Sequence, residues 1–334
     1  MAKTLHRRPE DDTEATNLTV DEPSRTIEAA KQLFCGGMAG SVAKTVTAPL
    51  ARLTILFQVH SLVTTKKYAP QYADGVLDGA KKIMQRGGFL SFWKGNGTSV
   101  LHRFPFSAIN FYVYENTLDL LSRTDGNSKE DANPIKRFIA GAFAGSIACV
   151  ACYPLDLVRT RLTTELPGKE HYRGIFDTFK KITATEGVGG LYTGVGPTLF
   201  VAVPNFAISY TVYGTLKEYV LDDDLFYNLR KIDDESGEKS MSLSLTLLCG
   251  AASGSASAFV TFPFDTIRRR MQIQTLHLPP EECLSGTQQF VNIIKTEGVK
   301  GLYRGIQPEL LKVVPFVGSM FVTYEFLKDQ LNVS

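Results

Sequence analysis

The sequence predicts an all-α membrane protein with six transmembrane helices in three pseudo-symmetric repeats, each with a short surface helix, around a central water-filled cavity. Three observations lead to this fold class. One set of motifs occurs three times at nearly constant spacing, several long stretches lack charged residues, and the charges inside the other apolar stretches are few. Charges within a membrane are costly, so these few should face a wet interior.

Prolines and glycines define the repeat. The first prolines of the three units each lie nine residues after a small-residue motif that ends in glycine, as in Gly40 and Pro49. Further along, an aromatic residue, any residue and a glycine recur, and a second proline follows twelve residues after the aromatic residue. Several offsets that agree three times over indicate internal repetition. Because proline removes a helical hydrogen bond, helix kinks are predicted at Pro49, Pro154 and Pro263.

The predicted spans follow from length and charge. Stretches 138–155, 191–216 and 241–264 contain no charged residue, and at ~1.5 Å per residue they are long enough for a bilayer core of ~30 Å. The six spans are expected at 33–60, 97–122, 134–163, 195–220, 242–274 and 306–331, with short amphipathic helices near 75–86, 174–186 and 285–296. The corresponding domains are a polar extension 1–32, repeats 33–122, 134–220 and 242–331, and an acidic loop 221–241.

Charge distribution gives the expected sidedness and excludes one class of partner. Segments 52–95, 156–193 and 265–304 together carry a net charge of +8, and the remaining segments carry −6. The three loops within the repeats should therefore share the more positive side, with both termini on the other. The whole chain has 36 basic and 34 acidic residues, a near-balance that gives no support for nucleic-acid binding.

No enzymatic or metal-binding motif in the sequence favours a function other than that of a membrane protein with three repeats. The sequence has no phosphate-binding loop, no zinc-protease motif and no nucleophile elbow. Cys149 and Cys152 have a CxxC spacing but lie in an apolar run, where small helix-packing residues are the simpler interpretation. We therefore expect no metal, no cofactor and no catalytic residue. The N-terminal residues lack an apolar core typical of a secretory signal.

The triplicated motif resembles the signature of the mitochondrial carrier family over about residues 33–330. That signature is P-x-[D/E]-x-x-[K/R]-x-[K/R], followed after a gap by an acid, glycine, four residues, an aromatic, a base and glycine. The third repeat matches it fully, and the second departs only at Thr193. The first repeat is degenerate, because Ala51, Thr54 and Leu56 stand at its charged positions. The resemblance implies a multi-pass carrier of the mitochondrial inner membrane with both termini on the intermembrane-space side.

The resemblance also implies two gates. Acids and bases at three-residue spacing share a helix face, so each acid can meet the next repeat's base and close one mouth of the bundle. Asp156 should pair with Arg268, whereas Ala51 faces Arg159 and Asp265 faces Thr54. The residues assigned to the matrix gate are Asp156, Arg159, Asp265, Arg268, Gln58 and Gln272. The cytoplasmic gate takes Glu115, Lys217, Glu325 and Lys328, of which only Glu115 and Lys217 can pair between repeats.

The predicted substrate site lies between the gates. Lys44, Lys312 and one of His102 or Arg103 should meet there, and no acid is expected at the same level of any span. Cations suit phosphate groups, and the small apolar Val201 and Ala202 suit a flat ring. The full set assigned to the substrate is Lys44, His102, Arg103, Asn110, Val201, Ala202, Asn205, Ser209 and Lys312.

The function expected is transport of a phosphorylated nucleotide-type solute, coenzyme A or an adenine nucleotide, by alternating access. Thiamine pyrophosphate or another anionic metabolite is an alternative cargo, and a non-transporting scaffold with the carrier fold is an alternative function. The expected partners are a small anionic substrate and membrane lipid such as cardiolipin, and the carrier is expected to act as a monomer.

Overall fold

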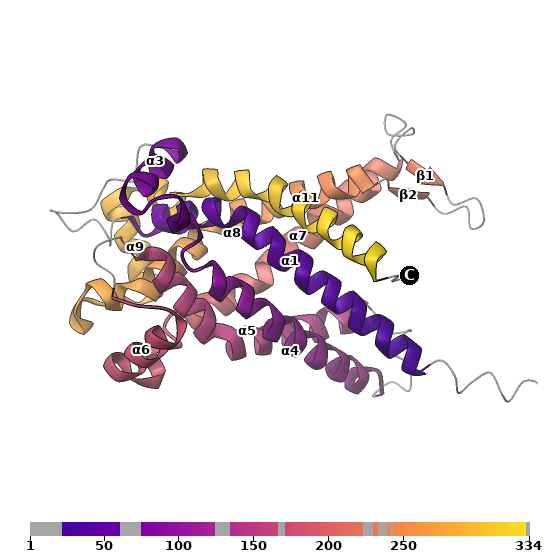
Figure 1. The fold of residues 1–334 in the computed structure, drawn as a ribbon, viewed down its shortest axis with the longest axis horizontal. Helices are drawn as coiled ribbons and strands as arrows, with labels where there is room; N and C mark the ends of the chain where they lie inside the picture. The colour runs from indigo at the N-terminus through magenta and orange to yellow at the C-terminus, as the bar shows by residue number, and fades with distance from the viewer. Residues whose placement is uncertain are drawn as a thin grey trace, which may run out of the picture.

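The computed structural model describes residues 22–60, 75–123, 134–165, 171–222, 230–232, 239–241 and 243–331. Residues 1–21 of the predicted N-terminal extension and most of the predicted acidic loop lie outside these ranges. In the described part, six long helices run along the longest axis of the molecule (Figure 1). They are α1 (Glu22–Gln58), α4 (Asn96–Arg123), α5 (Pro134–Thr164), α7 (Val195–Asp222), α8 (Leu243–His277) and α11 (Ile306–Gln330).

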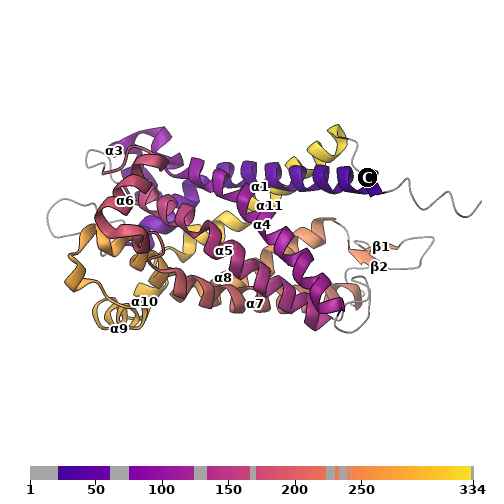
Figure 2. The same cartoon turned by 90° about the horizontal axis from the view of Figure 1, so that it is seen from below.

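Short helices gather at one end of the bundle, which we call the short-helix end (Figures 1 and 2). These are α3 (Val76–Gly87), α6 (Ile175–Gly190), α9 (Gly286–Glu297) and α10 (Val299–Leu302), with 3-10 turns at Phe89–Trp93 and Pro280–Glu282. The opposite end, which we call the terminal end, carries the start of α1 and the end of α11. It also carries a two-stranded antiparallel hairpin of β1 (Arg230–Ile232) and β2 (Lys239–Met241).

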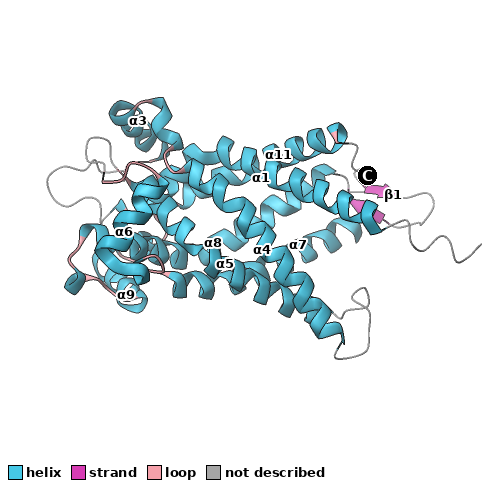
Figure 3. Ribbon diagram, turned by 60° about the horizontal axis from the view of Figure 1, so that its bottom comes forward, coloured by secondary structure: helices cyan, strands magenta, loops and turns pink. Residues whose placement is uncertain are grey.

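The architecture agrees with the predicted fold class, with two differences. The bundle is otherwise helical throughout the described ranges (Figure 3), but the expected loop 221–241 contains the small hairpin β1–β2. Helix α1 begins at Glu22 and not near residue 33. Part of the predicted polar extension is therefore the first turns of this helix.

Three of the long helices are apolar enough, by length and composition, to cross a membrane. They are Ile135–Thr164, Val195–Leu221 and a segment Val299–Gln330 that includes α11. The three other long helices, α1, α4 and α8, do not reach the same hydropathy. All six have a proline inside them, and the kinks expected at Pro49, Pro154 and Pro263 stay a prediction.

The three repeats close into a ring because each second long helix packs along the first long helix of the next repeat. Helix α4 lies against α5, α7 against α8, and α11 returns to lie against α1. The best-packed regions are at the short-helix end. There Leu53, Leu56 and Ile83 form an apolar cluster in repeat 1, and Leu157 and Ile182 belong to the corresponding cluster in repeat 2.

The repeated glycine after the aromatic residue fixes these contacts between repeats. Gly305 precedes α11 in a left-handed conformation with φ of 93°, and a Cβ there would lie 2.8 Å from the backbone oxygen of Thr54 in α1. Gly95 has φ of 84°, and its Cβ would lie 2.3 Å from Oγ1 of Thr163 in α5. Only glycine tolerates this backbone at so close an approach. The repeated glycine therefore serves packing of one repeat on the next.

Candidate functional site

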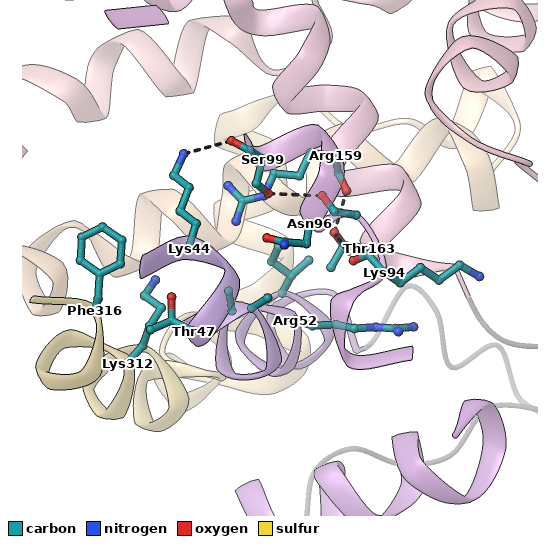
Figure 4. A pocket seen from close by; sticks show the side chains of 14 residues that line it. Lys44, Thr47, Arg52, Lys94, Asn96, Ser99, Arg159, Thr163, Lys312 and Phe316 are labelled. Carbon is teal, nitrogen blue, oxygen red and sulfur yellow. Dashed lines mark hydrogen bonds between the residues drawn. The ribbon is translucent and has the colours of Figure 1, made fainter. Parts of the chain in front are cut away.

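A cavity of about 270 Å³ lies in the half of the bundle toward the short-helix end. Its wall is built from α1, the start of α4, α5 and α11, so all three repeats contribute (Figure 4). Ala51 and Phe316 supply apolar surface, and Thr47 and Asn96 supply polar groups. The lining residues are Lys44, Thr47, Ala48, Ala51, Arg52, Ile55, Lys94, Gly95, Asn96, Ser99, Arg159, Thr163, Lys312 and Phe316.

The wall carries five cations, and only some of them have a nearby carboxylate. Lys94 Nζ lies 3.6 Å from the Glu165 carboxylate, and Arg52 donates to the Glu165 backbone oxygen at 3.1 Å. Lys44 donates to the backbone oxygen of Ser99 at 3.4 Å (Figure 4). Arg159 makes no ion pair within the described residues. The cavity is therefore a positively charged site.

One sequence-based expectation about this charge is wrong. We expected no acid at the level of the predicted cations, but Glu309 lies one turn before Lys312 on α11, and its Oε1 accepts a hydrogen bond from Lys312 Nζ at 2.6 Å. The i,i+3 spacing places both side chains on the same helix face. Glu309 therefore balances part of the positive charge, and the remaining excess comes from Lys44 and Arg159.

Of the nine residues assigned to the substrate, the cavity wall contains Lys44 and Lys312. His102 stacks on the ring of Phe106 with centroids 5.4 Å apart. The guanidinium of Arg103 lies against α1, about 3 Å from the Cβ that Gly40 lacks. Neither residue lines the cavity.

The remaining assigned residues lie elsewhere on the bundle. Asn205 donates to Thr261 Oγ1 on α8 at 3.3 Å, and Asn110 approaches α5 at Gly145. These two amides therefore contact neighbouring helices. Val201 is buried and Ala202 and Ser209 are half-buried, and none of the three belongs to the cavity wall.

The short-helix end is closed by a network centred on Asp156. Arg268 Nη2 donates to Asp156 Oδ2 at 2.5 Å, so the structure contains the one complete bridge expected at this gate. The same oxygen accepts from Gln272 Nε2 at 3.0 Å and lies 3.4 Å from Arg269 Nη1. Gln272 also bonds to Tyr153 and Thr160, so a glutamine and a second arginine join the predicted pair. Arg269 was not among the predicted gate residues.

The other predicted members of this gate have different surroundings. Asp265 lies 4.0 Å from Arg268 of its own helix, and this is the single ion pair that Asp265 makes among the described residues. Gln58 is buried, and its backbone oxygen accepts a hydrogen bond from Arg270 Nε at 3.0 Å. Arg159 lines the cavity together with Ala51. The gate is thus complete between repeats 2 and 3, and the cavity lies where the bridge between repeats 1 and 2 is missing.

Two buried arginines that sequence reasoning left without a role tie the repeats together. Arg161 holds Glu186 through both guanidinium nitrogens and donates to the Gln272 backbone oxygen. Arg270 pairs in the same way with Glu297 at 2.6 and 3.0 Å. These are the second base and the later acid of the repeated motif, so the signal was present in the sequence. In repeat 1 the corresponding position is Leu56, which packs in an apolar cluster.

At the terminal end, the predicted gate residues are not paired as expected. Within the described residues, Lys217, Glu325 and Lys328 make no ion pair, so the expected contact between Glu115 and Lys217 is not formed. One gate is therefore engaged and the other is not.

The described residues contain no cluster of three histidine, cysteine or acidic side chains that could hold a metal ion. Cys149 and Cys152 are free thiols. The cavity wall offers amines, two guanidinium groups, an amide, hydroxyls and an aromatic ring, and such groups bind anions and flat rings.

Comparisons with known proteins agree with the repeat structure. A family model described as mitochondrial carrier protein matches residues 25–125, 130–224 and 239–334. The chain is 36% identical over 304 residues to the mitochondrial adenyl nucleotide antiporter SLC25A24 of Homo sapiens, covering 91% of this chain and 59% of that protein. It is 34% identical over 307 residues to human solute carrier family 25 member 16, covering 91% and 89%.

A third relative is similar to the chain at nearly the same identity. The chain is 35% identical over 323 residues to the human mitochondrial adenyl nucleotide antiporter SLC25A25, covering 95% of this chain and 64% of that protein. The chain spans about three-fifths of the length of SLC25A24. The three matched segments of the family model fall on the three repeats of long and short helices described above. The chain belongs to the mitochondrial carrier family.

Proposed function

We propose that this chain is a carrier of the mitochondrial inner membrane that moves a phosphorylated, adenine-containing solute, coenzyme A or an adenine nucleotide, by alternating access. The observation that carries the proposal is the cavity to which three helices bring Lys44, Arg159 and Lys312. Ammonium and guanidinium groups form strong, charge-assisted hydrogen bonds with phosphate oxygens. The names of SLC25A24 and SLC25A25 support the same class of cargo.

The rest of the wall suits the remainder of such a molecule. Phe316 adds an aromatic face beside Lys312 (Figure 4), and a purine ring gains free energy when it stacks on an aromatic side chain. Thr47 and Asn96 add polar groups for hydroxyls or amino groups. A cation-rich wall with one aromatic face favours a phosphorylated ring compound over a small zwitterion.

The two ends of the bundle take opposite roles in this mechanism. The Asp156 network joins repeats 2 and 3 at the short-helix end, whereas at the terminal end Lys217 makes no ion pair among the described residues. We propose that the short-helix end faces the matrix and the terminal end faces the intermembrane space, since the loops at the short-helix end are the more positive. Transport then requires exchange of the Asp156–Arg268 contact for the Glu115–Lys217 contact.

The ring closes within a single chain, since α11 packs along α1. This closure supports a carrier that works as a monomer. Exposed apolar residues on the outer faces of the long helices, such as Phe143, Phe200 and Leu311, support contact with membrane lipid, for which cardiolipin is a candidate. Vesicles with and without cardiolipin would test that preference.

The decisive experiment is uptake into proteoliposomes that contain the purified full chain. Labelled ATP, coenzyme A and thiamine pyrophosphate are compared with a neutral amino acid. Lys44→Ala and Lys312→Ala should each remove most uptake, while Lys180→Ala, an exposed change on α6 outside the cavity, should not. Uptake of thiamine pyrophosphate alone would shift the cargo to that alternative. Uptake of no solute would favour the scaffold function and overturn the proposal.

The two lysine variants should differ in severity. Lys312→Ala leaves Glu309 without its 2.6 Å partner, so it adds a negative charge that repels the cargo. Lys44→Ala removes a cation that donates to the neutral backbone oxygen of Ser99. Glu309→Gln is the matched control, because the double variant with Lys312→Ala should recover part of the lost uptake.

A further inference from the structure

The missing bridge of the gate at the short-helix end has a specific geometric consequence. In repeats 2 and 3 the acid stands two residues and the base five residues after the first proline, and Asp156 of repeat 2 meets Arg268 of repeat 3. The same rotation about the bundle axis brings position 51 of repeat 1 to Arg159 of repeat 2. The structure agrees, since Ala51 and Arg159 line one cavity. A methyl group therefore stands where a carboxylate would have faced Arg159.

Among the residues that the structure describes, Arg159 finds no replacement for that carboxylate. Its neighbour on the helix, Asp156, is already held by Arg268, Arg269 and Gln272. Among the described residues no acid lies within ion-pair distance of the Arg159 guanidinium. A cation inside the membrane without a counter-charge is costly, so this position calls for an anion from outside the chain.

The space in front of Arg159 accommodates such an anion. The cavity volume of about 270 Å³ is many times the roughly 10–15 Å³ that one water needs. Lys44 and Lys312 line the same space (Figure 4). An oxyanion placed beside Ala51 therefore has cations from repeats 1, 2 and 3 around it.

We propose that a phosphate group of the cargo takes the place of the missing gate carboxylate beside Ala51, pairs with Arg159, and so completes the ring of bridges at the short-helix end. This inference rests on the proposed function and adds to it a specific role for Arg159 and Ala51. The cargo then closes its own gate. Without cargo, the pair of Asp156 and Arg268 is the one bridge of the predicted gate that forms among the described residues.

The test compares two nearly isosteric changes at residue 51 in the purified full chain. Ala51→Asp places a carboxylate beside Arg159, and Ala51→Asn places a neutral amide of the same size. The probe is inorganic pyrophosphate, whose dissociation constant is measured by thermal-shift titration. Ala51→Asp should weaken pyrophosphate binding about tenfold, the expected loss of one charged hydrogen bond, whereas Ala51→Asn should stay close to the wild type.

A second measurement is the melting temperature without any anion. Ala51→Asp should melt higher than Ala51→Asn, since only the carboxylate pairs with Arg159. If the aspartate variant does not fold, Arg159→Gln supplies the same information, because it should also weaken pyrophosphate binding about tenfold. Wild-type affinity for pyrophosphate in Ala51→Asp or, where that variant does not fold, in Arg159→Gln would overturn the inference.

The outcomes separate the two proposals. If Lys44→Ala loses nucleotide uptake and the variants at 51 and 159 bind pyrophosphate like the wild type, the proposed cargo stands and the gate inference fails. If pyrophosphate binding follows the predicted pattern but no nucleotide or coenzyme is taken up, the anion site stands and the proposed cargo fails.

Discussion

The Asp156 network offers the most quantitative test of the fold and the gate together. The perturbation is a double-mutant cycle of Asp156→Asn and Arg268→Gln, which removes each charge while nearly conserving shape. Asp156 Oδ2 accepts hydrogen bonds from Arg268 Nη2 at 2.5 Å, from Gln272 Nε2 at 3.0 Å and from Arg269 Nη1 at 3.4 Å. Because three donors converge on one oxygen, the two single variants should not cost the same.

Asp156→Asn removes the carboxylate that contacts both Arg268 and Arg269. Removing one partner of a buried pair costs about 3–5 kcal/mol, and Asp156 is 9% exposed, so we expect the lower part of that range. Arg268→Gln leaves Asp156 with Arg269 and Gln272, and we expect a loss of about 1–2 kcal/mol. The coupling between the two positions should be about 2 kcal/mol.

The assay is thermal unfolding of the purified chain in detergent, supported by uptake rates in proteoliposomes. The control cycle uses the exposed pair of Asp177 and Lys181 on α6, where the nitrogen and oxygen lie 2.8 Å apart. The hydrogen bond from Lys181, followed by that from the Arg173 backbone, lowers the pKa of Asp177. Solvent screens this pair, so its coupling should be much smaller than that between Asp156 and Arg268.

Two results would refute the reasoning. Additive losses at Asp156 and Arg268 would mean that the contact contributes nothing to the stability of this conformation. A larger cost for Arg268→Gln than for Asp156→Asn would mean that Arg269 and Gln272 do not share the carboxylate as the structure indicates.

Three further predictions follow from single contacts. Gly305→Ala should lower the free energy of unfolding by about 1–2 kcal/mol because the φ of Gly305 is 93°. The control Gly97→Ala should leave the stability unchanged, since Gly97 has open space around it, and melting temperatures check both variants. Leu56→Arg should destabilise repeat 1, and adding Gly87→Glu should restore part of the loss, since Arg270 and Glu297 pair at those positions in repeat 3; equal melting temperatures of the single and double variants would contradict this. Glu115→Lys should slow uptake by weakening closure of the terminal end, and an unchanged rate would remove Glu115 from the gate.

Much of the architecture is predictable from the sequence because repetition makes it so. The six long helices, the short helices between them and the prolines inside them follow from spacings that occur three times. The helix boundaries are less predictable. Helix α1 begins at Glu22, in a stretch too polar to be recognised as a membrane span. Such a stretch can still be helical, because a helix is held by backbone hydrogen bonds and can extend beyond the membrane.

The partners of the functional side chains were only partly predictable. Asp156 and Arg268 were expected to meet, because a three-fold arrangement fixes which helix follows which. The roles of Arg269 and Glu309 were missed, because each depends on which way one side chain turns from its helix. Arg103 is the opposite case, a residue that was expected at the substrate site and does not line the cavity. Its guanidinium lies against α1 at Gly40.

The sequence by itself determined the family, the three-fold repeat and the excess of positive charge near the middle of the chain's spans. Only the tertiary structure decided which cations face one cavity, and it joined Arg159 to Lys44 and Lys312 in place of His102 or Arg103. The physical reason is that a repeated sequence fixes the rise and order of helices, whereas electrostatic pairing falls off over a few ångströms. Distances of that size between side chains are set by how the six long helices pack, and no spacing along one helix specifies them.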